Sequence, residues 1–246
     1  MICDAHVHLK HGDAARTEYS AETIVRTMDA VGIDRAVVFA MSTTTRRSIA
    51  MAEQAVAQFP DRLIPYVYAL PHYQRSVSQE LAEAISRRGF RGIKIHVGEC
   101  TVADYVIDPV MELAGRLGVP CLVDFLGRHG AAESLARRFP ATKLIVCHLG
   151  AYLSTNEHLL EQFTSLAEQH PNVYLDVSGV ALVRRIAEAV RRVGSHRVIW
   201  GTDGPHQSPD TVSFARLSLD TIRGLHLDEA AERDVLGGSI ARLLNI

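Results

Sequence analysis

The stretch ICDAHVHL, residues 2–9, is the first of the apolar, strand-like runs that decide the fold class, and it sets two histidines at alternate positions. Residues i and i+2 of a β-strand point to the same face, so His6 and His8 should project together. Further apolar runs follow along the chain, and they are rich in Val, Ile, Leu and aromatic residues. They cover residues 35–41, 63–70, 92–97, 119–126, 143–150, 172–179 and 197–204. Nearly continuous apolar runs of this kind are typical of parallel strands covered by helices.

Each apolar run is followed by an amphipathic segment that stops at glycine or proline, as helices do. The first such segment has Ser20 as its expected N-cap and Gly32 as its stop. Repeated strand–helix units predict a (β/α)8 TIM barrel, forming one domain over residues 1–246. Residues 228–246 should add one or two extra helices packed against the barrel. A doubly wound open sheet is the alternative architecture.

Charge, apolar run lengths and cysteine spacing indicate which kinds of partner the protein binds and in which cellular compartment it works. The formal net charge is −2, which gives no electrostatic reason to expect nucleic acid. No apolar run approaches the roughly 20 residues that span a bilayer, and the N-terminus lacks a signal-peptide pattern. The four cysteines form no CxxC pair, so neither a disulfide framework nor a cysteine-based zinc site is expected. We therefore expect a cytoplasmic protein that acts on a small molecule, without a nucleic-acid or membrane partner.

Polar residues at the ends of the predicted strands point to a metal site. Active sites of such barrels lie at the carboxyl ends of the strands. Two imidazoles on one wall make half of a divalent-metal site, although HxH alone is a weak signal. Asp203 ends the last strand, which lies beside the first strand in a closed barrel. It can ligate a metal and accept a proton from water, or it can be a turn residue before Gly-Pro. His148, late in the sixth run, is a candidate general acid or base, or a further ligand.

Several short motifs together resemble a known family. The resemblance rests on HVH at 6–8, FPDRL at 59–63, GIKIH at 92–96, HLG at 148–150, GTDGP at 201–205 and GGSIARLL at 237–244. In this order they resemble the amidohydrolase superfamily. The most similar branch is the amidohydrolase-related or type 2 branch, which includes proteins like aminocarboxymuconate-semialdehyde decarboxylase. The resemblance covers essentially the whole chain.

The resemblance implies one divalent metal held by His6, His8 and Asp203, with zinc expected and manganese as the alternative. It also implies that His148 orients or deprotonates water at the metal. One position departs from the family, since the strand-five segment that normally ends in a metal-binding histidine ends here in Asp124. Asp124 can replace that ligand through a carboxylate oxygen, or it can be a structural hydrogen-bonding residue.

Four further residues are candidates for substrate binding. Lys94 and His96 lie on the fourth strand, and Lys94 can pair with Asp124 or bind an anionic substrate. His72 and Arg128 follow the third and fifth strands. They could contact a substrate carboxylate, or they could be ordinary solvated loop residues.

The sequence leaves three functions open. The first is a metal-dependent hydrolase of a small amide, lactone or ester that uses metal-activated water. The second is a lyase of the same family that decarboxylates its substrate with the same residues. The third is a catalytically silent barrel that binds a small molecule, and the substitution at Asp124 is its only support. A homo-oligomer is compatible with all three and is common in the family that the chain resembles.

Overall fold

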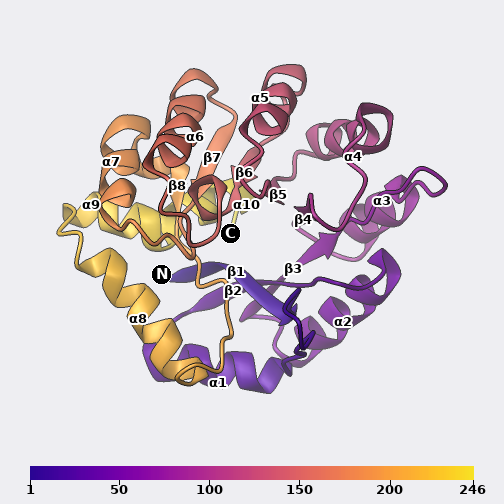
Figure 1. The fold of residues 1–246 in the computed structure, drawn as a ribbon. Coiled ribbons are helices and arrows are strands. Elements are labelled where there is room, and N and C mark those ends of the chain that lie inside the picture. The colour runs from indigo at the N-terminus through magenta and orange to yellow at the C-terminus, as the bar shows by residue number, and fades with distance from the viewer.

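The computed structural model describes residues 1–246 and contains one eight-stranded parallel sheet in which the strands follow their order in the sequence. The strands are β1 (Cys3–Lys10), β2 (Arg35–Ala40), β3 (Leu63–Tyr68), β4 (Gly92–His96), β5 (Cys121–Asp124), β6 (Leu144–Val146), β7 (Val173–Asp176) and β8 (Val198–Ile199). The helices that follow them are α1 (Ala21–Val31), α2 (Thr45–Gln58), α3 (Ser78–Arg87), α4 (Asp104–Leu117), α5 (His129–Arg138), α6 (Glu157–Gln169), α7 (Arg184–Val193) and α8 (Thr211–Arg223). Figure 1 shows these helices forming a ring around the strands, which confirms the predicted (β/α)8 barrel.

The sheet is brought to closure by contacts between β1 and the segment that follows β8. The backbone N–H of Ala5 donates to the carbonyl of Trp200 at 3.2 Å, and that of His8 donates to the carbonyl of Gly204 at 2.7 Å. Val7 also pairs in parallel with Gly204. An open doubly wound sheet would leave the first and last strands apart, so these contacts exclude it.

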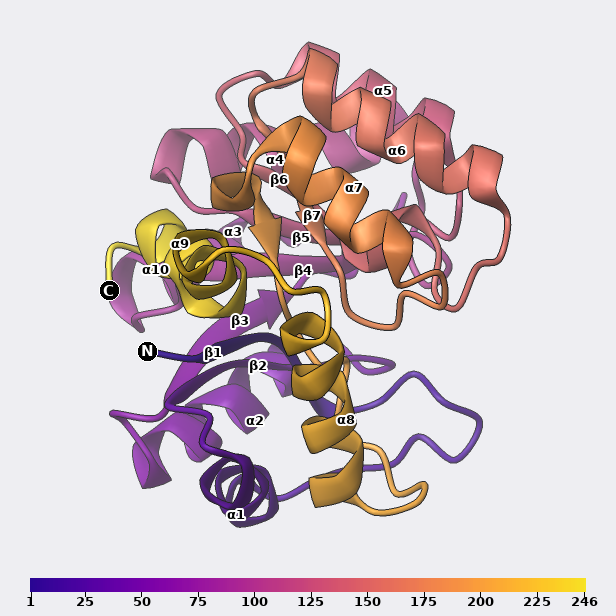
Figure 2. The same cartoon turned by 90° about the vertical axis from the view of Figure 1, so that its left-hand side faces the viewer.

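The core has two parts, one between the strands and the surrounding helices and one inside the barrel. The inner part is filled by large side chains such as Phe39, Tyr66 and Tyr68, which are fully buried. Ile240 and Leu243 join this inner cluster from α10 (Ser239–Leu244), which follows α9 (Glu229–Arg233). Figure 2 shows α9 and α10 at the end of the barrel where the chain begins. The predicted extra helices are therefore confirmed, and they cover the end opposite to the strand carboxyl ends.

The predicted glycine and proline stops hold at all eight helices of the barrel, and the start of α4 is instructive. Helix α1 has Ser20 as its N-cap and Gly32 in the left-handed conformation at its end, as predicted. Helix α4 ends before Gly118 as predicted, but it begins at Asp104, so an extra turn precedes Pro109 inside the helix. The extra turn buries Ile107 in the core, and this burial offsets the backbone hydrogen bond that proline cannot donate. None of the helices is long and apolar enough to cross a membrane.

Strands β6 and β8 are shorter than predicted because side-chain acceptors replace strand partners. The backbone N–H of His148 donates to the Asp176 carboxylate at 3.1 Å, and that of Thr202 donates to the Asp4 carboxylate at 2.9 Å. His148 and Asp203 then adopt left-handed φ values of 59° and 60°. Both residues therefore lie just beyond the strands on which the sequence analysis placed them.

Gly201 allows the end of β8 to approach β1, and its replacement gives a testable expectation. A Cβ atom on Gly201 would lie 2.7 Å from the Cβ and 3.0 Å from the backbone nitrogen of His6. Gly201→Ala should therefore lower the free energy of unfolding by about 1–3 kcal/mol, measured by chemical denaturation. Gly130→Ala is the matched control, because a Cβ there meets nothing within 4 Å. Equal stability of the two variants would contradict this account of the barrel seam.

Candidate metal centre and active site

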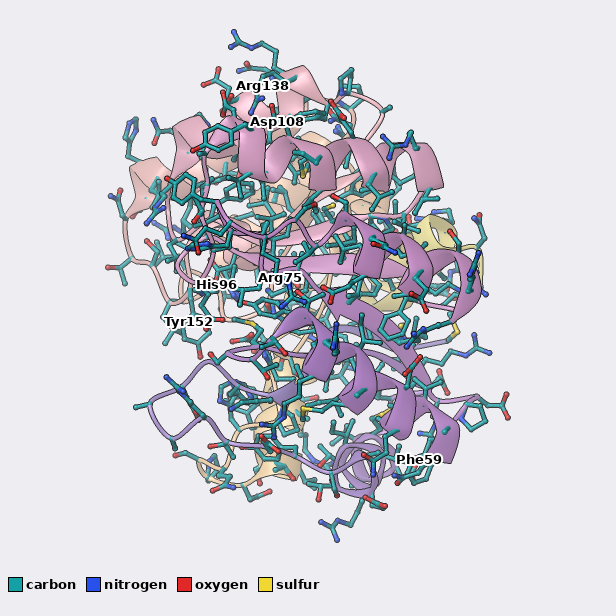
Figure 3. All side chains as sticks on the ribbon, turned by 90° about the vertical axis from the view of Figure 1, so that its right-hand side faces the viewer. Phe59, Arg75, His96, Asp108, Arg138 and Tyr152 are labelled. Atoms are coloured by element: carbon teal, nitrogen blue, oxygen red, sulfur yellow. The ribbon has the colours of Figure 1, made fainter.

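A pocket of about 260 Å³ opens at the carboxyl ends of the strands. Six imidazoles line it: His6, His8, His11, His96, His148 and His206. The charged side chains that join them are Lys94, Asp13, Asp124 and Asp203. Figure 3 shows the labelled His96 and Tyr152 at this end of the barrel, with Phe59, which follows α2, at the other end. The pocket is therefore polar and rich in groups that can ligate a metal or carry a proton.

His6, His8 and Asp203 meet in this pocket, as the alternation of the first strand predicted. The Nε2 atom of His8 lies 2.9 Å from Asp203 Oδ1, and the Nε2 atom of His6 lies 3.1 Å from the same oxygen. One ligand atom from each residue lies within 4.8 Å of the others, and all three residues are buried. The donor set of two imidazoles and a carboxylate suits zinc, with a further position left for water or substrate.

Local structure fixes Asp203 opposite the two histidines. The preceding Thr202 donates its hydroxyl and its backbone N–H to the Asp4 carboxylate at 2.6 and 2.9 Å. Asp4 lies on β1, two residues before His6, so the same strand that carries the histidines anchors the turn that carries Asp203. An aspartate tolerates the left-handed backbone at this turn better than most residues do.

The protonation states of His6 and Asp203 also suit metal binding. Burial, followed by the nearby Lys94 ammonium, lowers the pKa of His6 to about 4, so this imidazole is neutral at pH 7. Burial alone would raise the pKa of Asp203, but His148, His6 and His8 outweigh it and hold the pKa well below its usual value. A neutral imidazole and an ionised carboxylate are the forms that bind a divalent ion.

Two other groups lie close to His6 and bear on the fit of a metal. The Lys94 ammonium donates to His6 Nε2 at 3.1 Å and to Cys147 Sγ at 3.2 Å. It would therefore compete with a metal for the lone pair of His6 Nε2. Its long, flexible side chain can turn away from that atom. His6, Cys147 and His148 form a second group of ligand atoms within 4.8 Å. Burial raises the pKa of the Cys147 thiol well above its usual value, which disfavours a thiolate ligand. The His6, His8 and Asp203 set therefore fits a divalent ion better.

Asp124 lies in the same pocket but outside the group formed by His6, His8 and Asp203. Its Oδ2 atom is 3.4 Å from His96 Nε2 and 3.6 Å from His148 Nε2, and its Oδ1 atom accepts from the backbone N–H of Leu126 at 2.9 Å. Burial alone would raise the pKa of Asp124, but His148, Lys94 and His96 outweigh it and lower the pKa. Asp124 is therefore an ionised group on the pocket wall, and its role as a ligand stays a prediction.

His148 faces the pocket with its Nε2 atom. Its Nδ1 atom donates to the carbonyl of Ser178 at 3.0 Å, and its ring lies 5.1 Å from that of His6. Burial alone would lower the pKa of His148, but the carboxylates of Asp203, Asp124 and Asp176 outweigh it and raise the pKa to about 9. The imidazole thus stands among three carboxylates with one nitrogen free for proton transfer.

The predicted substrate-binding residues divide into two pairs. Lys94 and His96 line the pocket, as predicted from their places on β4. His72 and Arg128 are exposed and do not line it, so their alternative reading as solvated loop residues is favoured. His72 instead forms a short backbone bridge with Arg75.

The sequence analysis missed several residues of the pocket wall. His11 lies three residues after His8, its ring stacks on that of His8 at 4.3 Å, and its Nε2 atom donates to the carbonyl of Pro205 at 2.8 Å. His11 directly follows the end of β1, and this position at a strand carboxyl end could have marked it as a pocket residue. Tyr152 lies with its ring 5.1 Å from that of His148, and no local pattern marked it.

Comparison with solved structures shows proteins of the same fold. A probable 2-pyrone-4,6-dicarboxylic acid hydrolase from Acinetobacter baumannii is 16% identical, with a TM-score of 0.75 over 100% of this chain and 99% of that one. The 5-carboxyvanillate decarboxylase from Sphingomonas paucimobilis is 15% identical, with a TM-score of 0.78 and the same coverage. An amidohydrolase from Burkholderia multivorans with bound zinc is also 15% identical, with a TM-score of 0.78 and the same coverage. At these identities the likeness establishes the fold alone.

Sequence comparison gives a more specific result. No curated protein matches the chain. A family profile described as amidohydrolase, however, matches residues 3–246, which is nearly the whole chain. This match confirms the resemblance to the type 2 branch that the sequence motifs indicated. The chain therefore belongs to the amidohydrolase family.

Proposed function

We propose that this protein is a metal-dependent hydrolase of a small carbonyl compound, such as an amide, lactone or ester. The observation that carries the proposal is the meeting of His6 Nε2, His8 Nε2 and one Asp203 oxygen within 4.8 Å at the strand carboxyl ends. These three residues would hold one divalent metal, with zinc expected and manganese as the alternative. When bound, such an ion lowers the pKa of a water molecule and polarises a carbonyl group.

The chain's own residues supply the proton transfers and the orientation of the substrate. Asp203 Oδ1 faces the two imidazoles, which leaves Oδ2 to accept a proton from the attacking water. His148 Nε2 faces the pocket and can pass a proton to the leaving group. Lys94 and His96 lie on the wall beside Asp124, where a positive group can bind a negatively charged part of the substrate.

The size and lining of the pocket favour a small, polar substrate. Its volume of about 260 Å³ lies below the usual range for sites that bind drug-sized molecules. Few apolar groups line it, among them Met41 and Leu126. A small molecule with one or two carboxylates and a reactive carbonyl therefore fits the pocket better than a large apolar one.

Decarboxylation is the second candidate function. Two of the proteins with similar folds are a 5-carboxyvanillate decarboxylase and a 2,6-dihydroxybenzoate decarboxylase. The buried Lys94 ammonium supports this candidate, because a cation in the pocket can hold the carboxylate that is to be lost. The metal residues would be the same for both reactions.

A paired experiment tests the proposal and separates the candidates. Protein purified without chelator is analysed for metal and then assayed, before and after treatment with a strong chelator and after return of zinc or manganese. Small esters, lactones and amides are followed by acid release, and aromatic carboxylates by release of carbon dioxide.

We expect about one metal per chain and hydrolysis that is lost and recovered with the metal. Full activity without metal would overturn the proposal. Carbon dioxide release alone would favour the lyase, and neither metal nor turnover would favour the silent barrel.

A further inference from the structure

Two buried residues at the end of β7 lie between His6 and His148 and have no role in the chemistry described above. Asp176 is fully buried and Ser178 is 1% exposed. The Ser178 hydroxyl lies 3.2 Å from His6 Nδ1 and 3.0 Å from His148 Nδ1. One hydroxyl group thus touches both the imidazole proposed to hold the metal and the imidazole proposed to move the proton.

The hydrogen bonds of Ser178 can be assigned atom by atom. Its hydroxyl donates its single hydrogen to Asp176 Oδ1 at 2.5 Å. A hydroxyl has one hydrogen and two lone pairs, so both remaining contacts must be bonds that it accepts. The Nδ1 atoms of His6 and His148 must therefore both carry hydrogen.

The partners around Ser178 impose the same assignment independently. His6 Nδ1 is 3.2 Å from Asp176 Oδ2, and an ionised carboxylate can only accept. His148 Nδ1 is 3.0 Å from the carbonyl of Ser178, which also can only accept. Asp176 Oδ1 in addition accepts the backbone N–H groups of His148 and Ser178, each at 3.1 Å. Every donor in this cluster faces an acceptor.

We propose that Asp176 and Ser178 are positioning residues that together keep hydrogen on Nδ1 of both His6 and His148. Both rings then turn Nε2 to the pocket, where His6 presents the lone pair that binds a metal and His148 presents the nitrogen that passes a proton to the leaving group. Asp176 also holds the backbone of His148 at the end of β6, so the two rings keep their relative placement. The proposal rests on the proposed function for its purpose, but the tautomers follow from the hydrogen bonds alone.

The first test reads the tautomers directly and does not depend on activity. Nitrogen-15 NMR of the histidine rings in the zinc-treated protein distinguishes Nδ1–H from Nε2–H, and His6→Ala and His148→Ala identify the two sets of signals. We expect hydrogen on Nδ1 of both rings. Hydrogen on Nε2 with a bare Nδ1 in either ring would overturn the proposal. If no metal binds, the proposed function fails while this reading still decides the tautomers.

The second test measures zinc affinity by competition with a chelator in two variants. Asp176→Asn replaces one acceptor oxygen by an NH₂ donor that faces the N–H groups now bound there, so the affinity should fall by about 10–100-fold. Ser178→Ala removes the bridge but keeps the carboxylate, and its loss should be smaller, near the lower end of that range.

Ser195→Ala is the matched control, because the Ser195 hydroxyl donates to Asp234 at 2.8 Å beside the C-terminal helices. It should leave the zinc affinity unchanged. Folded Asp176→Asn and Ser178→Ala proteins with the affinity of the control would contradict the proposal. Should Asp176→Asn fail to fold, the zinc affinity of Ser178→Ala and the nitrogen-15 NMR spectrum of the unmodified protein still test the proposal.

Discussion

His8→Ala should remove the bound metal and lower turnover by a factor of about 1,000 or more. The substitution leaves one imidazole and one carboxylate, and two ligands hold a divalent ion poorly. Loss of the ion forfeits several kcal/mol of transition-state stabilisation, and about 1.4 kcal/mol corresponds to a factor of ten in rate. Elemental analysis of the purified variant and its kcat on the substrate found by screening check this expectation. His6→Ala and Asp203→Asn should behave alike.

His158→Ala is a suitable control for this prediction. His158 is an exposed histidine on α6 outside the pocket, so its loss removes an imidazole without touching the proposed centre. The control should retain metal and turnover. A His8→Ala protein that folds and keeps about one metal per chain would show that the ion, if present, is held elsewhere.

His148→Ala should lower kcat by about 100- to 10,000-fold while the metal content stays close to one per chain. The reason is that His148 Nε2 faces Asp124 at 3.6 Å and is the nitrogen left free for proton transfer, since its Nδ1 atom is bound to Ser178. Metal analysis beside kcat separates this role from that of a ligand. Loss of the metal together with the activity would instead make His148 part of the metal centre.

Much of the fold could be predicted from sequence because its signals are local and repeated. The apolar runs and their glycine or proline stops gave the strands and helices in the right order, and the alternation of His6 and His8 placed both rings in one pocket. Closure of the barrel, which puts Asp203 beside them, followed from the strand count.

The remaining features depend on contacts between residues far apart in the chain. The early ends of β6 and β8 arise because Asp176 and Asp4 accept backbone N–H groups of other strands, and no local pattern reveals that. The directions of His72 and Arg128 depend on loop conformation, so residue type and position after a strand were insufficient. Asp124 is at the predicted strand end, but its carboxylate faces His96 and His148 from the two neighbouring strands, which residue type and position did not reveal.

Anomalous diffraction from zinc-treated crystals tests the central claim most directly, because it locates the ion itself. We expect one strong peak about 2.0–2.2 Å from His6 Nε2, His8 Nε2 and an oxygen of Asp203. No peak in the pocket, or a peak that these three side chains do not share, would contradict the proposed metal centre.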